Sequence, residues 1–157
     1  MPNIKDWLAD QPITMTKLAG PYESVSDDHW KHDAYVLRLD WKTPTEQRTS
    51  PELKYRMGVG HRVRKYDRRL GMHVQRALPQ PEMLDVFESL VSDAACYEEA
   101  QDFADFCDNL GYTLDSAANI RLAEKAYAGC GEVAGWLTAF VGGHAVMQRL
   151  MYELERS

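Results

Sequence analysis

Residues 79–94 read Pro-Gln-Pro-Glu-Met-Leu-Asp-Val-Phe-Glu-Ser-Leu-Val-Ser-Asp-Ala, and the spacing of hydrophobic residues changes within this stretch. Before it, hydrophobic residues alternate with polar ones; after it, they recur about every 3.6 residues, as on one face of a helix. Pro81 suits the first helical position, where the missing N–H has no intrahelical partner to lose. The chain therefore divides into an N-terminal half that forms strands and a C-terminal half that forms helices.

Upstream of this stretch, three segments alternate in the manner of strands: residues 12–18, 34–41 and 53–57. In the second segment Tyr35 and Leu37 fall on one face, and Arg38 falls on the other. The third segment runs back beside the second, so the pattern predicts a three-stranded antiparallel sheet.

The two remaining upstream segments lack a clear period. Gly20-Pro21 opens a polar segment, 20–33, which we expect to be rich in turns. Residues 61–75 are basic and contain Gly71, and they predict a long loop with short helical turns.

Downstream, caps and glycines separate the predicted helices. The first follows Pro81, with its buried stripe from Met83 to Ala94. The second begins at Asp102 and stops at Gly111. The third begins at Asp115-Ser116 and ends at Gly129 or Gly131.

The last stretch, Val133 to Leu154, carries hydrophobic residues in heptad spacing, interrupted by Gly142-Gly143. It can form one long helix that pairs with a second copy of the chain, or two helices folded back at the glycines. The unbroken spacing favours the long helix, and with it a homodimer. The side chains expected to self-associate are Leu137, Phe140, His144, Met147, Met151 and Leu154.

These elements predict an α+β fold, in which a three-stranded antiparallel sheet precedes a helical half of four or five helices. A chain of 157 residues suits one domain. We expect a β-rich part over residues 1–78, with a basic loop at 54–76, and an acidic helical part over 79–157. Together they are expected to form one structural domain with a C-terminal helical extension.

The charge is divided in the same way. The whole chain has 24 acidic and 18 basic residues, a net charge of −6. Residues 1–81 hold 14 Lys/Arg and 10 Asp/Glu, a net of +4, whereas residues 82–157 hold 4 and 14, a net of −10. The net negative charge of the whole chain argues against a generic nucleic-acid binder. The opposite net charges of the two halves, however, predict one basic and one acidic surface.

Several classes of protein are disfavoured. No apolar run approaches the ~20 residues that span a bilayer, and residues 1–10 do not resemble a signal peptide. The three cysteines are widely spaced, as is typical of a reducing compartment. Phosphate loops, nucleophile elbows and HExxH motifs are absent, so we expect no enzyme and no cofactor. The acids and histidines of 27–33 predict a polar turn rather than a metal site.

The basic segment is one of two candidate interfaces. Eight cations between Lys54 and Arg76, with Tyr66 and His73 among them, could neutralise phosphates and stack on bases. The alternative is a solvated loop that lies against the acidic half, and the sequence leaves both open. The nucleic-acid-binding residues would be Arg62, Arg64, Lys65, Arg68 and Arg69.

Acidic residues at the start of the second helix form the other candidate. They could dock on a cationic protein, such as the nucleic-acid groove of another molecule. Equally, they could serve solubility and interact with the helix dipole. The set, here called the acidic set, is Glu98, Glu99, Asp102, Asp105 and Asp108.

Several segments between roughly Trp30 and Cys130 form a familiar set: residues 83–94, 102–107, 110–112 and 115–116, with 55–61 at the end of a strand and 123–127. This part of the chain resembles a family of small proteins of unknown function encoded by phages, prophages and plasmids. The basic insert after His61 and the helix with Gly142-Gly143, beyond the usual end, depart from that family.

This resemblance implies a mobile genetic element but no reaction. Together with the cysteine pattern, it leads us to expect a protein of the host cytoplasm. Some small acidic proteins of such elements block host defence, as anti-CRISPR proteins do. The leading hypothesis is therefore a non-enzymatic inhibitor whose acidic set occludes a nucleic-acid-handling surface of a defence complex such as a CRISPR-Cas surveillance complex or its nuclease. The alternatives are a phage accessory protein that binds nucleic acid through 54–76, and a dimeric scaffold.

Overall fold

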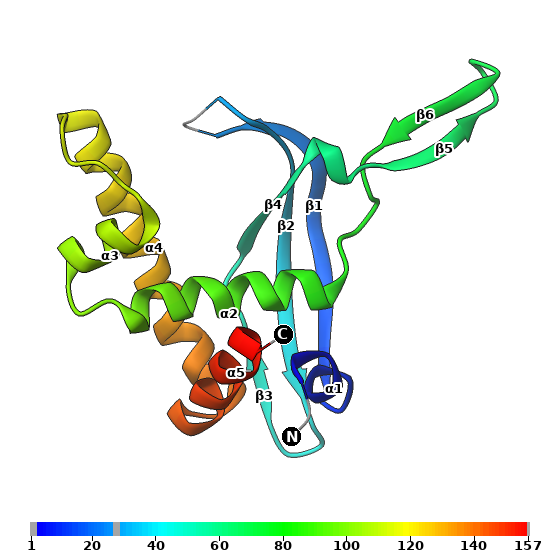
Figure 1. Cartoon of the computed structure of the whole chain (residues 1–157). Coiled ribbons are helices and arrows are strands. Elements are labelled where there is room, and N and C mark those ends of the chain that lie inside the picture. The colour runs from blue at the N-terminus through cyan, green and yellow to red at the C-terminus, as the bar shows by residue number, and fades with distance from the viewer. Residues whose placement is uncertain (1–2, 27–28, 157) are drawn as a thin grey trace. The chain divides into compact units, whose positions relative to one another are not determined.

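The computed structural model describes residues 3–26 and 29–156, and it shows the predicted α+β class (Figure 1). The chain forms two compact units. One comprises Pro12–Met83 and holds the strands, and the other comprises Met1–Gln11 with Leu84–Ser157 and holds the helices. The strand unit carries 13 Lys/Arg and 9 Asp/Glu, a net charge of +4, so the helical unit carries −10.

The strand unit is built on an antiparallel sheet of four strands, β1 (Ile13–Val25), β2 (Lys31–Lys42), β3 (Gln47–Thr49) and β4 (Leu53–Gly58). Strand β2 is central, and β1 pairs with one of its edges. Along the other edge, β4 pairs with the first part of β2 and β3 pairs with its end. Tyr35, Leu37 and Leu39 on β2 are fully buried. The Tyr35 hydroxyl donates a hydrogen bond to the carbonyl oxygen of Leu78 at 2.6 Å.

The prediction of a turn-rich segment at 20–33 was wrong for most of its length, because β1 continues to Val25 and β2 already begins at Lys31. The β1–β2 register shifts on both sides of Ala19, so a bulge accommodates the Gly20-Pro21 pair. Gly20 has φ 106°, and a Cβ there would lie 2.5 Å from the carbonyl oxygen of Ala34. Of the predicted polar turn 27–33, Asp27 and Asp28 lie outside the described residues.

The predicted loop at 61–75 is a β-hairpin. After a short 3-10 turn, η1 (Val59–His61), strands β5 (Val63–Asp67) and β6 (Met72–Arg76) pair antiparallel as a separate two-stranded sheet. Asp67 shapes the loop between them, because its carboxylate accepts the N–H groups of Arg69 and Leu70 at 2.9 and 3.2 Å. Figure 1 shows this hairpin extending away from the four-stranded sheet of its own unit.

The helical unit contains α1 (Ile4–Ala9), α2 (Met83–Glu99), α3 (Phe103–Leu110), α4 (Ala117–Val141) and α5 (His144–Arg156). Four helices thus follow the sheet, as predicted, whereas α1 was not expected. Trp7 in α1 packs against Phe87 in α2, with their ring centroids 5.5 Å apart. Helix α3 begins and ends as predicted, with Asp102 as its N-cap and Gly111 in the left-handed conformation at its end.

Two predictions about α4 were wrong. The helix passes through Gly129 and Gly131 instead of ending there. At Gly131 a Cβ would lie 2.9 Å from the ring of Tyr97, so glycine permits close packing of α4 on α2. The favoured single long helix is instead broken at Gly142 and Gly143, which have φ angles of 106° and 128°.

A basic hairpin as candidate nucleic-acid interface

The β5–β6 hairpin, residues 63–76, concentrates positive charge. Together with Arg62 immediately before it, the hairpin has six Lys/Arg and a single acid, Asp67. Most side chains of the hairpin are exposed, so it has no hydrophobic face to bury. Backbone hydrogen bonds between the two strands stabilise it instead. The cations of the segment are Arg62, Arg64, Lys65, Arg68, Arg69 and Arg76.

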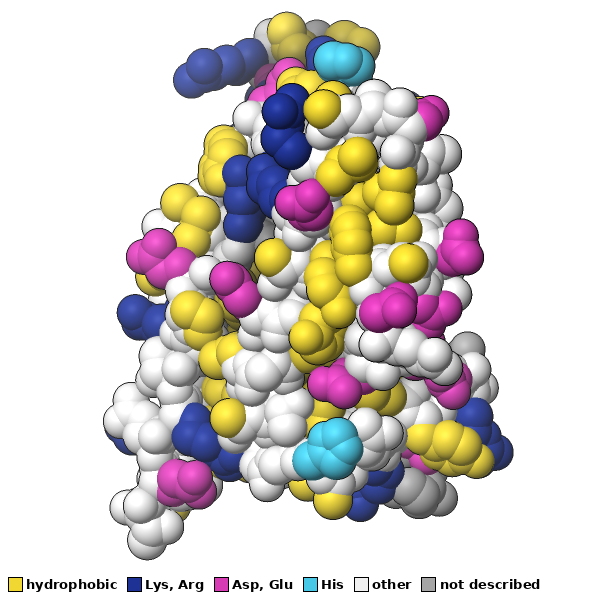
Figure 2. Space-filling view, turned by 90° about the vertical axis from the view of Figure 1, so that its left-hand side faces the viewer, with side chains coloured by type: hydrophobic (Ala, Val, Ile, Leu, Met, Phe, Trp, Pro, Cys, Tyr) yellow, Lys and Arg dark blue, Asp and Glu magenta, His cyan; other side chains and the backbone are white. Residues whose placement is uncertain are grey.

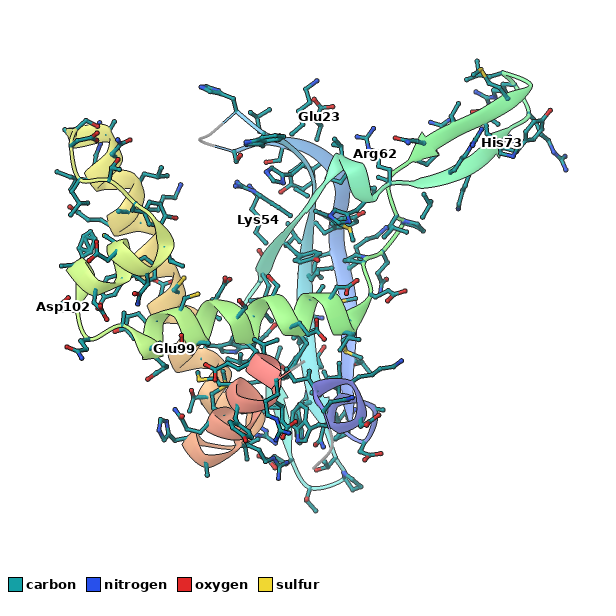
Figure 3. The ribbon with its side chains drawn as sticks, viewed as in Figure 1. Glu23, Lys54, Arg62, His73, Glu99 and Asp102 are labelled. Carbon is teal, nitrogen blue, oxygen red and sulfur yellow. The ribbon has the colours of Figure 1, made fainter. Side chains whose placement is uncertain are left out.

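One face of the hairpin combines aromatic and polar side chains. The register places Arg64 opposite Gln75 and Tyr66 opposite His73, and directly opposed residues point to the same face. The rings of Tyr66 and His73 meet edge to face with centroids 5.3 Å apart. Tyr66 is 57% exposed. Figure 3 shows His73 on the hairpin, well beyond the labelled Arg62. We call these four side chains the aromatic face.

The opposite face is partly neutralised. Asp67 forms an ion pair with Arg76 across the two strands. The pKa of Asp67 is lowered, chiefly by the hydrogen bond from the N–H of Leu70. Arg76 and the N–H of Arg69 lower this pKa further, whereas burial of the carboxylate raises it. Within the hairpin, the cations that remain exposed and form no ion pair with a described residue are Arg64, Lys65, Arg68 and Arg69.

Arg62 differs from the other four residues predicted to bind nucleic acid. Its Nε and Nη2 donate to the two carboxylate oxygens of Asp33 at 3.0 and 2.9 Å, in a bidentate pair. Asp33 is only 5% exposed. The hydrogen bond with Asp33 raises the pKa of the guanidinium. Sequence reasoning missed this pair, although Asp33 falls in register with buried Tyr35, and a charge on an apolar face signals a buried partner.

In the acidic set, two members have structural roles. Asp102 accepts the N–H of Asp105 at 2.8 Å, and Asp105 accepts the N–H of Gln101 at 3.0 Å, so both cap the start of α3. Figure 3 shows Glu99 and Asp102 where α2 leads into α3. A hydrogen bond to Glu155 raises the pKa of Glu99. Figure 2 shows acidic side chains on both sides of a stripe of hydrophobic ones.

The side chains predicted for self-association are mostly used inside the chain. The break at Gly142 gives α5 its own direction, and α5 packs on α4. His144 is exposed and Leu154 is half-buried. The four that are buried, and so not available to a second copy, are Leu137, Phe140, Met147 and Met151.

The three cysteines converge on one small cluster in the helical unit. Cys107 is buried beside Phe106 and Ala123, and Cys96 and Cys130 pack against them. Burial raises the pKa of all three thiols, that of Cys130 to about 11, with a contribution from Asp93. The thiols are therefore protonated at neutral pH, which suits packing.

Comparison with protein-family models, curated proteins and solved structures gave no match to this chain. Within residues 3–26 and 29–156, no helix combines the length and apolar character needed to cross a bilayer. The same residues contain no group of three or more His, Cys, Asp or Glu placed to hold a metal ion. The inferences about function therefore rest on the geometry of the hairpin and of the acidic set.

Proposed function

We propose that the protein binds nucleic acid through the β5–β6 hairpin. The observation that carries the proposal is the exposure of Arg64, Lys65, Arg68 and Arg69 on a two-stranded ribbon, without ion pairs among the described residues. Exposed cations on a narrow element can reach phosphates, here from strand β5 and from the loop that follows it. Each phosphate contact releases counterions, which is the main source of sequence-independent affinity.

The rest of the hairpin suits the same ligand. A two-stranded ribbon is narrow enough to enter a nucleic-acid groove. On the aromatic face, the ring of Tyr66 offers a surface on which a base can stack, with Arg64 nearby for the phosphate. Arg62 is not part of this contact surface, because Asp33 holds it at the base of the hairpin.

Fluorescence anisotropy with a labelled oligonucleotide, at low and at physiological salt, tests the proposal. The hairpin variant replaces Arg64, Lys65, Arg68 and Arg69 with Ala. A matched control removes the same charge from exposed cations elsewhere, by replacing Lys42, Arg121, Lys125 and Arg149 with Ala.

The hairpin variant is expected to bind at least about tenfold more weakly at low salt, because it loses up to four phosphate contacts. The control should bind like the wild type, apart from a small change due to net charge. If wild type does not bind at low salt, or if both variants weaken binding equally, the proposal fails.

A second candidate is the anti-CRISPR type of inhibitor, which would block a nucleic-acid groove of a defence complex. The observation in its favour is that Glu98, Glu99 and Asp108 are exposed, and that no member of the acidic set forms an ion pair with a described cation. Unpaired negative charge of this kind can replace phosphates on a basic groove.

This candidate is tested by DNA binding of a purified CRISPR-Cas surveillance complex in the presence of the protein. Wild type should reduce DNA binding, whereas a variant with Glu98→Lys and Asp108→Lys should not. The control reverses two exposed acids on α4, Glu124→Lys and Glu132→Lys, and should act like wild type. Equal inhibition by all three proteins would exclude the acidic set as the contact surface.

A further inference from the structure

The four-stranded sheet has one buried face and one open face. Directly opposed residues of paired strands point to the same face, so the strand register assigns each side chain to a face. Asp33, Tyr35 and Leu37 of β2 are buried and lie on one face. Ala34 and Val36 lie on the other face, and the four residues of β1 and β4 that oppose them are exposed. We call this second surface the open face.

Two adjacent rows of the open face combine one aromatic ring with two cations. The first row runs from β1 across β2 to β4 and consists of Tyr22, Ala34 and Arg56. The second row follows the same path and consists of Ala19, Val36 and Lys54. Neither row contains an acid, so the charge of these two rows is +2.

The ring of Tyr22 lies across the sheet towards β4. The Nζ atom of Lys54, on β4, is 5.9 Å from the centre of this ring. Because β2 separates β1 from β4, the two side chains approach each other above β2. Ala34, directly opposite Tyr22, is fully buried although it belongs to the open face, whereas Tyr22 itself stays 40% exposed. Aromatic rings on an open sheet face are a platform on which unpaired bases stack.

Lys54 and Arg56 are available to phosphates. Both are exposed, and neither forms an ion pair with a described residue. They lie two residues apart on β4, about 7 Å along the strand, so one phosphate chain can contact both. Asp40, an acid further along the open face, is already engaged by Arg38 at 3.6 Å and by the hydroxyl of Thr49 at 2.9 Å.

From these observations we infer that the open face binds single-stranded nucleic acid, with one base stacked on Tyr22 and neighbouring phosphates on Lys54 and Arg56. The inference rests on the proposed binding through the hairpin, and it adds a second contact in the same unit. Figure 3 shows Lys54 on β4, apart from His73 on the hairpin. An intact duplex does not suit the open face, because its bases are paired and stacked and extruding one is costly.

The first test compares a short labelled single strand with the duplex of the same sequence by fluorescence anisotropy. Wild type should bind the single strand more tightly. Tyr22→Ala should weaken single-strand binding roughly 5- to 150-fold, the range found for loss of one base–aromatic stack, and leave duplex binding unchanged. Tyr22→Phe keeps the ring and should bind like wild type. Tyr152→Ala removes an exposed tyrosine from α5 and serves as the control.

The second test replaces Lys54 and Arg56 with Ala. Loss of two phosphate contacts should make the slope of log affinity against log salt concentration shallower by about 1.4 on the single strand, at about 0.7 per contact. The matched control removes two exposed cations of α4, by Arg121→Ala and Lys125→Ala, and should keep the wild-type slope. If the double variant loses binding to labelled polyglutamate but not to the oligonucleotide, the open face serves an acidic polypeptide and the inference is wrong.

A third measurement uses the wild-type protein, so it does not depend on folding of a variant. A single strand that carries iodouracil is crosslinked by light, and mass spectrometry identifies the modified residue, which should be Tyr22. Crosslinks to Tyr66 or His73 without one to Tyr22, or equal affinity for single strand and duplex, would overturn the inference while leaving binding through the hairpin intact. Failure of both strands to bind would overturn the proposed function as well.

Discussion

The hairpin and the junction between α2 and α3 are both densely charged, but they use their charges differently. In the hairpin, the exposed cations lie on strand β5 and in the loop after it, and the backbone groups there pair with β6 or with Asp67. These cations are Arg64, Lys65, Arg68 and Arg69. At the junction, Asp102 and Asp105 accept backbone N–H groups that would otherwise lack a partner. A run of like charges therefore indicates an interface only where the charged atoms have no hydrogen-bond or ion-pair partner within the fold.

The largest effect on stability is expected from Asp33→Ala, which tests whether Arg62 is structural. The variant leaves a guanidinium without its bidentate partner, and it should lower the free energy of unfolding by about 2–3 kcal/mol, less than for a fully buried pair because Arg62 is partly exposed. Urea denaturation followed by circular dichroism measures this.

The matched control is Glu23→Ala, which removes an exposed acid that lies 3.8 Å from Lys31. Its effect should stay below about 1 kcal/mol, as for other exposed ion pairs. If the two variants are equally stable, Arg62 is not held by a structural pair, and it belongs with the free cations of the hairpin.

A smaller effect is expected from Asp102→Ala, which tests the structural role of the acidic set. Loss of the N-cap of α3 should cost about 1 kcal/mol. Glu98→Ala, on the neighbouring end of α2, makes no such cap and should be neutral within about 0.5 kcal/mol. Thermal unfolding distinguishes the two. An equal cost would mean that negative charge, rather than capping, stabilises the junction.

The smallest effect concerns Glu99, whose hydrogen bond with Glu155 raises its pKa in the folded state. The favourable contribution is present below the ordinary pKa of a glutamate and is lost as the pH rises through the raised value. Glu99→Gln should therefore be a few tenths of a kcal/mol more stable than wild type at neutral pH. At low pH the difference should vanish. If the difference in stability between Glu99→Gln and wild type stayed the same at all pH values, Glu99 would not be paired with Glu155.

Hydrophobic periodicity predicted the elements that bury one face. The centre of β2, the start of α2 and both ends of α3 follow from alternation, from Pro81 and from the caps at Asp102 and Gly111. The hairpin was missed because its stability comes from backbone pairing, and exposed side chains on both faces leave no hydrophobic period. The remaining signal was Asp67 followed four residues later by Gly71, at φ 63°, which suits the loop of a hairpin.

Glycines were the main source of error elsewhere. Gly20 and Gly131 interrupt a strand and a helix in sequence, but both positions exist because another group comes close, the Ala34 carbonyl and the Tyr97 ring respectively. Such contacts depend on tertiary packing, so they cannot be predicted from local sequence. The charge of the basic segment can be read directly from the sequence, whereas the bidentate pair of Arg62 with Asp33 depends on tertiary packing.

The most direct test of the central claim is the salt dependence of single-strand binding by wild type and by the variant with Arg64, Lys65, Arg68 and Arg69 replaced by Ala. Each phosphate contact contributes about 0.7 to the slope of log affinity against log salt concentration on a single strand. If all four cations contact phosphates, the slope of the variant should be shallower by about 3. Parallel slopes would contradict the account, because the exposed cations of the hairpin would then not be the ones that bind.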